Sequence, residues 1–254
     1  MSNPRSANRA PASLPYLTHP LLEAVPGLVH GFGLRGWEAG DAEKAWPGFR
    51  LIELEQIHSD ILRFVEAPPE RRLRGDALAT DRPGLLLAIR TADCLPLLIA
   101  DTERRVAAAV HAGWRGTSLG IAARAVRGLG ERYGSRPAAL VAALGPCIGP
   151  ACYEVGEDVR AEFIRAGAGT AAFVTRPADA GGPGTPGAEG AASGRKYLLD
   201  LRAANRAQFA AAGVPPAAVV DAGACTHCDA RLLSYRRDRD TTARLYNVIG
   251  LRNP

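Results

Sequence analysis

Two short apolar runs rich in branched residues, Leu95 to Ala100 and Val106 to Val110, stand close together in the middle of the chain. The polar stretch 101–105 separates them. Runs of this length and composition around a polar break are typical of a buried β-hairpin. If Asp101 pairs with Arg104 around a two-residue turn, the register places Cys94 opposite His111 at the open end.

Other apolar segments predict the rest of the fold. A periodic apolar face running from Ile121 to Leu129 predicts a helix, with Thr117 or Ser118 as its N-cap. Further helices are expected at 157–166 and 202–212. Strands are expected at 49–57, 62–66, 85–89, 139–144, 219–220, 232–236 and 247–251.

Two segments lack this periodicity. Residues 1–15 are polar with repeated proline, and we expect a disordered tail before an ordered region at 16–254. Residues 177–195 are of low complexity and are expected to form a mobile surface loop within one domain, because ordered sequence resumes at once near Tyr197. No run of eighteen apolar residues and no apolar leader segment is found, so we expect a cytoplasmic protein without a membrane partner.

The formal net charge of +5 comes from scattered arginines, with only Lys44 and Lys196 as lysines. No basic block is interleaved with aromatic residues, which argues against a nucleic-acid partner. A mildly positive field still favours phosphate or another anion. The five cysteines are an odd number in a chain too large to need disulfides, so we expect reduced thiols that are free to bind a metal.

The predicted hairpin brings Cys94 and His111 together, and directly opposed side chains lie about 4.5 to 5.5 Å apart at Cβ. His58, at the end of the predicted strand 49–57, is a third candidate ligand. Three protein ligands with an open position are typical of catalytic zinc. The alternative for each residue alone is a small core cysteine or a hydrogen-bonded histidine. The three together, beside His-Ala-Gly-Trp-Arg-Gly, favour the metal.

Two charged residues flank these ligands. Arg115 lies just before the predicted helix, whose free backbone N–H groups and the guanidinium together would bind an anion such as phosphate. Asp93 is predicted either to orient a ligand or to cap a turn, and the sequence does not favour one reading.

A second cysteine set has C-x-x-C spacing at Cys225 and Cys228, with Cys147 and Cys152 in a glycine- and proline-rich loop. Three interpretations are open: a structural zinc site with four thiolates, a redox pair, or buried thiols near the active site. The last of these is favoured.

The segments TADCLPLLIAD, HAGWRGT, GDALATDRPG, GPCIGPACYEVGEDV and CTHCDARLLSYRRDRDTTARL resemble the multicopper polyphenol oxidase-like, or laccase-domain, purine nucleoside phosphorylases of YfiH type. The resemblance implies an α+β fold in a single domain, with packed mixed sheets flanked by helices. It also implies zinc, rather than copper, held by His58, Cys94 and His111. Purine nucleosides and inorganic phosphate are the implied partners, in a monomer or weak homo-oligomer.

Two departures from the family pattern concern the site. The segment around Arg35 is abbreviated, which puts any substrate contact from it in question; the neighbouring His30 is predicted to be structural. Ala243 stands where the family commonly has glycine, which could perturb a turn near the site.

We therefore expect a zinc-dependent purine nucleoside phosphorylase acting on adenosine, inosine and methylthioadenosine, with adenosine deaminase activity, in which Cys94, His111 and Arg115 are catalytic. One alternative is a metal-free cysteine hydrolase using Cys94 and His111. A polyphenol oxidase is disfavoured, because a multicopper site needs many histidines and the chain has five. A module that binds without catalysis is the remaining class.

Overall fold

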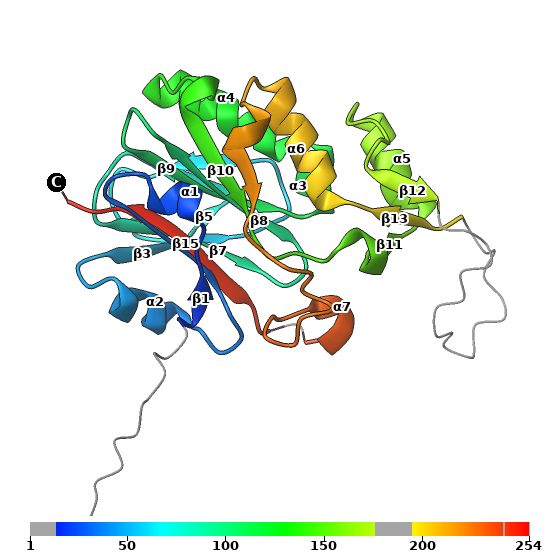
Figure 1. Cartoon of the computed structure of the whole chain (residues 1–254), viewed down its shortest axis with the longest axis horizontal. Coiled ribbons are helices and arrows are strands. Elements are labelled where there is room, and N and C mark those ends of the chain that lie inside the picture. Colours follow the sequence, from blue (N-terminus) through cyan, green and yellow to red (C-terminus); the bar gives the residue numbers. More distant parts are fainter. Residues whose placement is uncertain (1–13, 176–194, 241, 254) are drawn as a thin grey trace, which may run out of the picture.

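Two six-stranded sheets face each other at the centre of the computed structural model, which describes residues 14–175, 195–240 and 242–253 (Figure 1). The first sheet has the order β1-β2-β15-β7-β3-β5. Its strands are β1 (Tyr16–Leu17), β2 (Leu28–Gly33), β15 (Leu245–Leu251), β7 (Leu85–Thr91), β3 (Arg50–Glu55) and β5 (Leu73–Arg74).

The second sheet has the order β14-β10-β8-β9-β6-β4 and contains the predicted hairpin. Its strands are β14 (Val219–Asp221), β10 (Leu140–Leu144), β8 (Leu95–Asp101), β9 (Val106–Ala112), β6 (Ala77–Thr80) and β4 (Leu62–Phe64). Parallel and antiparallel neighbours occur in both sheets, so the α+β class with mixed sheets is confirmed.

A small third sheet lies to one side, with the order β11-β13-β12 (Figure 1). Its strands are β11 (Glu154–Val155), β13 (Tyr197–Leu199) and β12 (Phe173–Thr175), and Thr175 pairs directly with Tyr197. The helices are α1 (Pro20–Glu23), α2 (Ala39–Ala45), α3 (Trp114–Ser118), α4 (Ile121–Tyr133), α5 (Glu157–Arg165), α6 (Leu201–Ala211) and α7 (Tyr235–Asp238). Among the described residues, none of these helices has the length and hydrophobicity needed to cross a bilayer.

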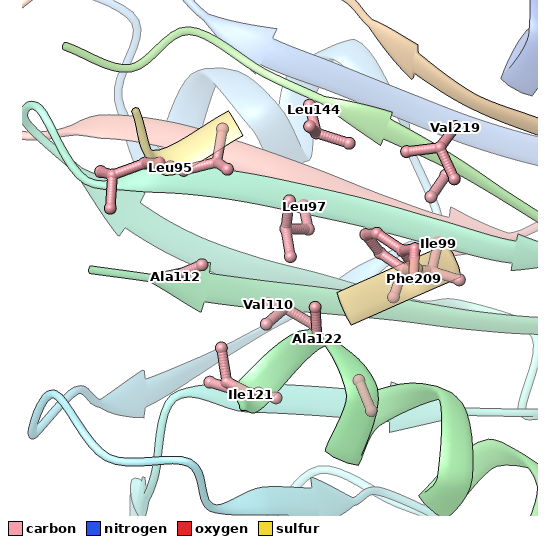
Figure 2. Packing of buried hydrophobic residues seen from close by; sticks show 14 of the residues in the cluster. Leu95, Leu97, Ile99, Val110, Ala112, Ile121, Ala122, Leu144, Phe209 and Val219 are labelled. Carbon is pink, nitrogen blue, oxygen red and sulfur yellow. The ribbon is translucent and has the colours of Figure 1, made fainter. Parts of the chain in front are cut away.

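Strands β8 and β9 are buried on both faces, which explains why their sequences are continuous apolar runs instead of alternating ones. Leu95, Leu97 and Ile99 pack toward α4 and α6, where they meet Ile121 and Phe209 (Figure 2). The intervening residues of β8 face the first sheet and pack between the two sheets. The sheet that contains the hairpin is therefore the middle layer, between the first sheet and helices α4 and α6.

The hairpin itself is confirmed, but the predicted register is wrong. Asp101 pairs with Val106 across a four-residue loop, so His111 lies opposite Pro96 and not opposite Cys94. The Asp101 carboxylate accepts hydrogen bonds from the backbone N–H groups of Glu103 and Arg104, which stabilises the longer loop. The register differs by two positions, so each side chain keeps its predicted face.

Two further predictions are wrong. Thr117 and Ser118 are not an N-cap, because they lie inside α3, and Gly120 in a left-handed conformation precedes α4. Residues 232–236 do not form a strand: Leu232 and Leu233 are buried in a loop, and Ser234 caps α7 by accepting from the N–H of Arg237. The other predicted helices and strands are present within a few residues. The predicted tail and the loop at 177–195 fall almost wholly outside the described residues.

His30 on β2 has a structural environment. It is 4% exposed, and its Nε2 accepts a hydrogen bond of 2.9 Å from the backbone N–H of His19 at the start of α1. Burial lowers the pKa of His30 to about 4. The imidazole is therefore neutral at pH 7, and protonation would remove the acceptor that holds α1.

This burial predicts a loss of stability in mild acid. The unfolded chain takes up a proton on this histidine near pH 6.5 and the folded chain only near pH 4, so the stability that His30 confers is complete above pH 6.5 and falls as the pH drops toward 4. The maximum loss is about 3 kcal/mol. Urea unfolding between pH 7 and 4.5 should show this loss in wild type and a flatter profile in His30→Gln. Equal slopes in the two proteins would contradict the assignment.

Candidate metal centre and active site

Three segments bring His58, Cys94 and His111 together at one end of the hairpin. His58 lies three residues beyond β3, Cys94 lies just before β8, and His111 lies on β9. One nitrogen of each imidazole and the Cys94 sulfur all lie within 4.8 Å of one another. The imidazole rings meet edge to face, with centroids 4.9 Å apart. The convergence predicted from the sequence is present, although its register is different.

Asp76, just before β6, organises two of these ligands. Its carboxylate is fully buried and lies 2.8 Å from His111 Nδ1. It also accepts hydrogen bonds from the backbone N–H groups of residues 57–59 and from the Ser59 hydroxyl. Those contacts hold His58 in a left-handed conformation, with φ of 58°. Asp76 therefore fixes the loop that carries His58 and directs the other ring nitrogen of His111 toward Cys94.

Asp76 was missed as a site residue in the sequence. Its only signal was its place in the segment GDALATDRPG, directly after Gly75, whose φ of 157° suits glycine. A Cβ on Gly75 would come within 2.9 Å of the Ile61 carbonyl oxygen. A lone aspartate in a sequence does not indicate which backbone groups it contacts, so the assignment needed the structure.

Gly113 leaves room beside the cluster. A Cβ added there would lie 3.0 Å from Cys94 Sγ, 3.2 Å from His58 Cδ2 and 3.8 Å from His111 Cε1. Its backbone angles are ordinary extended values. The glycine is therefore required by the space that the three side chains occupy and not by its backbone conformation.

The cluster favours a thiolate. Burial by itself would raise the pKa of the Cys94 thiol, but the charge and hydrogen bonds of His111 and His58 lower it to about 6. Burial would likewise lower the pKa of His111, but the Cys94 charge and hydrogen bonds with Asp76 and Cys94 raise it to about 9. Both shifts favour a Cys94 thiolate beside a protonated His111, and a cation binding here would displace the His111 proton that faces the sulfur.

These donors fit a zinc ion. One thiolate sulfur and two imidazole nitrogens are the ligands that zinc prefers, and three of them leave a coordination position open. The carboxylate behind His111 and the absence of a Cβ at Gly113 suit the same ion. Cuprous copper also accepts thiolate and imidazole ligands, so the donor set alone does not select between the two metals.

The cluster opens into a cavity of about 450 Å³. Arg90, Arg244 and the exposed ring of Tyr235 line its wall. The cavity is completed by Gln56, His58, Thr91, Ala92, Cys94, His111 and Thr242. Its size is within the range for a small-molecule site, and its walls offer two cations and one aromatic face.

The two arginines of the cavity differ in how far their charges are compensated. Arg90 pairs with Glu53 at 3.6 Å, and Gln56 holds its backbone by donating to its carbonyl and accepting from its N–H. Arg244 donates to the backbone carbonyls of Ala243, at 2.7 Å, and Asp240, at 3.4 Å. These partners are carbonyl groups without net charge, although the Arg244 charge also acts on the Asp240 carboxylate. The guanidinium on the cavity wall can therefore still bind an anion.

Arg115 lies outside the lining of this cavity. It is exposed on α3, with its guanidinium carbon 4.3 Å from the centroid of the Trp114 ring. Its charge acts on Tyr153: burial and the negative charge of Cys94 raise the pKa of that hydroxyl, and the positive charge of Arg115 lowers it. The helix start expected to help Arg115 bind an anion is not where the sequence placed it, because α4 begins only at Ile121 and α3 has five residues.

Asp93 is hydrogen-bonded to two distant segments of the chain. Its carboxylate accepts hydrogen bonds of 2.6 Å from the Thr226 hydroxyl and from the backbone N–H of Arg236. Its φ of 83° makes it one of the few described residues other than glycine in the left-handed region. The aspartate thereby ties the residue next to Cys94 to two distant segments of the chain.

The two departures from the family pattern both fall near this region. Arg35 donates to the carbonyls of Ala230 and Leu232 and pairs with Asp238 at 2.8 Å, so here its guanidinium anchors the C-terminal segment. Ala243 lies between two cavity residues and is not among the described positions with positive φ. Alanine therefore fits there without backbone strain.

Comparisons with known proteins identify the family and agree with the fold. Residues 42–252 match the family model described as multi-copper polyphenol oxidoreductase laccase. A protein from Deinococcus radiodurans named purine nucleoside phosphorylase is 42% identical over 201 residues, covering 79% of this chain and 70% of that protein. One from an unknown prokaryotic organism, named adenosine deaminase RL5, is 38% identical over 161 residues, covering 63% of this chain and 56% of that protein.

A solved structure has the same fold. The crystal structure of the Bacillus licheniformis hypothetical protein YfiH superposes with a TM-score of 0.78 at 28% identity, covering 94% of this chain and 98% of that one.

Proposed function

The chain belongs to the multi-copper polyphenol oxidoreductase laccase family, and we propose that it is a zinc-dependent purine nucleoside phosphorylase with adenosine deaminase activity. The proposed substrates are adenosine, inosine and methylthioadenosine. The observation that carries the proposal is the cavity of about 450 Å³ that has the thiolate–imidazole cluster and two arginines on its walls.

In the proposed complex, the exposed Tyr235 ring stacks on the purine and Arg244 binds phosphate, with Arg90 as a second cation. Arg115 is proposed as a further catalytic cation, acting from the α3 side of the cluster. His58, Cys94 and His111 are the proposed zinc ligands. A zinc ion there would supply Lewis acidity next to the substrate.

The residues perform the reaction by positioning. In phosphorolysis a phosphate oxygen forms a bond to C1′ of the ribose while the bond from C1′ to the purine nitrogen breaks, and the purine takes up a proton. Arg244 would hold the phosphate dianion close to C1′ and slow its dissociation into solvent. In deamination water adds at C6 of adenosine and ammonia leaves. Arg244 has no anion to bind in that second reaction.

This difference gives the test. Wild-type protein with adenosine and phosphate should release adenine, and without phosphate it should release only inosine. Arg244→Ala should slow phosphorolysis by roughly ten- to a hundred-fold, mainly by raising the KM for phosphate, and should change deamination little. Product chromatography of the wild-type and Arg244→Ala reactions measures adenine and inosine in the same mixture.

Arg127→Ala is the matched control, since Arg127 is an exposed arginine on α4 that pairs with Glu131. Adenine release that is independent of phosphate would argue for hydrolysis instead. An equal loss of both reactions in Arg244→Ala would remove its role as phosphate ligand.

A second candidate function is a metal-free cysteine hydrolase. It is favoured by the line of Cys94, His111 and Asp76, in which a thiolate of pKa about 6 faces an imidazole held by a buried carboxylate. A chelator would leave such an enzyme active, and iodoacetamide would inactivate it. A polyphenol oxidase is less well supported, because His19 and His30 contact one another away from the cluster and cannot serve a multicopper centre there.

A further inference from the structure

A second cluster of sulfur atoms lies outside the cavity. The sulfur atoms of Cys152, Cys225 and Cys228 lie within 4.8 Å of one another, and those of Cys152 and Cys228 are 3.4 Å apart. Cys152 is in the loop that follows β10, and the other two are in the loop that follows β14. Because β10 and β14 pair in parallel, both loops leave the same edge of the sheet.

The Cys225 sulfur is surrounded by N–H donors. The backbone N–H of Gly149 donates to it at 3.1 Å, and those of His227 and Cys228 also point to it. Gly149 allows this approach, since a Cβ there would lie 3.3 Å from both Cβ and Sγ of Cys225. Several amide N–H groups aimed at one sulfur stabilise a thiolate.

Cys147 does not belong to this cluster. It is fully buried, and its thiol contacts the carbonyl oxygen of Ile148 at 3.5 Å. Burial raises the pKa of Cys147 to about 12, so it stays a thiol at neutral pH. The four-thiolate site considered from the sequence is therefore wrong. The favoured interpretation of buried thiols holds for Cys147 but not for the half-buried Cys152 and Cys225 or the exposed Cys228.

We propose that Cys152, Cys225 and Cys228 bind one thiophilic cation, Zn²⁺ or Cu⁺, at a second metal site near the surface. Three sulfurs within reach of one ion are a ligand set that these two metals prefer. The sulfur separation of 3.4 Å between Cys152 and Cys228 is far longer than the roughly 2.05 Å of a disulfide. Each thiol releases its proton as its sulfur binds the cation.

The geometry of the cluster suits a shared cation. The three sulfurs lie within 4.8 Å of one another, and the backbone N–H of Gly149 already donates to Cys225 at 3.1 Å. Without a cation, sulfurs this close keep protons between them; a bound cation would let all three bind as thiolates.

The second site would brace the wall of the first. Thr226, between the two cysteines of the C-x-x-C turn, donates to the carboxylate of Asp93, the neighbour of Cys94. Tyr153 follows Cys152 directly, and burial together with the Cys94 charge raises the pKa of Tyr153. A cation joining the two loops would thus hold both segments that contact the Cys94 region, whatever reaction the cavity performs.

Counting metal tests this proposal without any activity assay. Reduced wild-type protein, loaded with Zn²⁺ and desalted, should hold about two ions per chain, and Cys228→Ser and Cys94→Ala about one each. The double variant should hold about none. Cys147→Ser is the matched control and should hold as many ions as wild type. A parallel anaerobic Cu⁺ titration shows which of the two metals binds the second site more tightly.

Co²⁺ in place of zinc reports on the ligands. Sulfur-to-cobalt charge-transfer absorption should persist in Cys94→Ala and fall in Cys228→Ser. Circular dichroism of Cys228→Ser verifies its fold, which we expect to be intact because Cys228 is exposed. One ion in both wild type and Cys228→Ser would overturn the proposal. So would a mass lower by two hydrogen atoms in the protein as purified, before reduction, located to a disulfide bond between Cys152 and Cys228.

Discussion

Cys94→Ala is expected to lose the metal of the cavity and nearly all phosphorolysis of adenosine. Alanine removes the only sulfur among the three ligands and one of the two negative partners of the buried His111 ring, the other being Asp76. Two imidazoles alone bind zinc weakly. We expect kcat/KM to fall by roughly a hundred- to a thousand-fold, the scale for losing one group that stabilises a developing charge. Metal content and product chromatography on the same samples measure both effects.

Cys147→Ser is a suitable control for this experiment. It changes a buried cysteine whose sulfur belongs to neither cluster. Cys94→Ala protein that still turned over adenosine at the wild-type rate would refute the assigned site. Loss of activity with full retention of zinc in the cavity would instead favour the cysteine nucleophile.

Asp76→Asn is expected to weaken both the metal site and the fold. The carboxylate accepts from three backbone N–H groups, from the Ser59 hydroxyl and from His111 Nδ1. An amide presents N–H donors toward some of those donors and leaves them unpaired in a fully buried position. We expect a loss of about 3 kcal/mol or more in unfolding free energy. The metal dissociation constant should rise by roughly ten- to a hundred-fold.

The two effects can be separated. Ser59→Ala removes one donor to Asp76 and leaves the contact with His111, so it should lose stability with little loss of metal affinity. The metal dissociation constant is measured at a temperature where both variants are folded. Nitrogen NMR of the His111 ring reports which of its two nitrogens carries the proton. Asp76→Asn that bound metal as tightly as wild type would show that the carboxylate is structural only.

The central hairpin was predictable because its information is local. Two apolar runs and a polar break determine the strands, and the residues at their outer ends must then converge, which places Cys94 near His111. The register was not predictable, because Asp101 stabilises a four-residue loop through its own side chain. The error was harmless to the site, since a shift of two positions preserves the faces of both strands.

Long-range contacts were harder to predict. His58 reaches the hairpin through parallel pairing of β3 with β7, and Asp76 holds it through backbone groups. Arg244 and Tyr235 come from the far end of the chain, which Arg35 and Asp93 tie to the cavity wall. The pair Leu232 and Leu233 fits a strand as well as a buried loop, and the hydrogen bond at the Ser234 cap decides between them.

The small third sheet has a consequence for how this chain can change length. Its strands β12 and β13 pair Thr175 directly with Tyr197, so the chain leaves and returns at adjacent points. Residues inserted between these two points would close a loop whose ends are already held together, at a cost of about 0.6 kcal/mol for each doubling of loop length. Relatives could gain or lose residues here over evolution, and a reporter or affinity domain could be grafted between these points, without any strand of the two large sheets having to move.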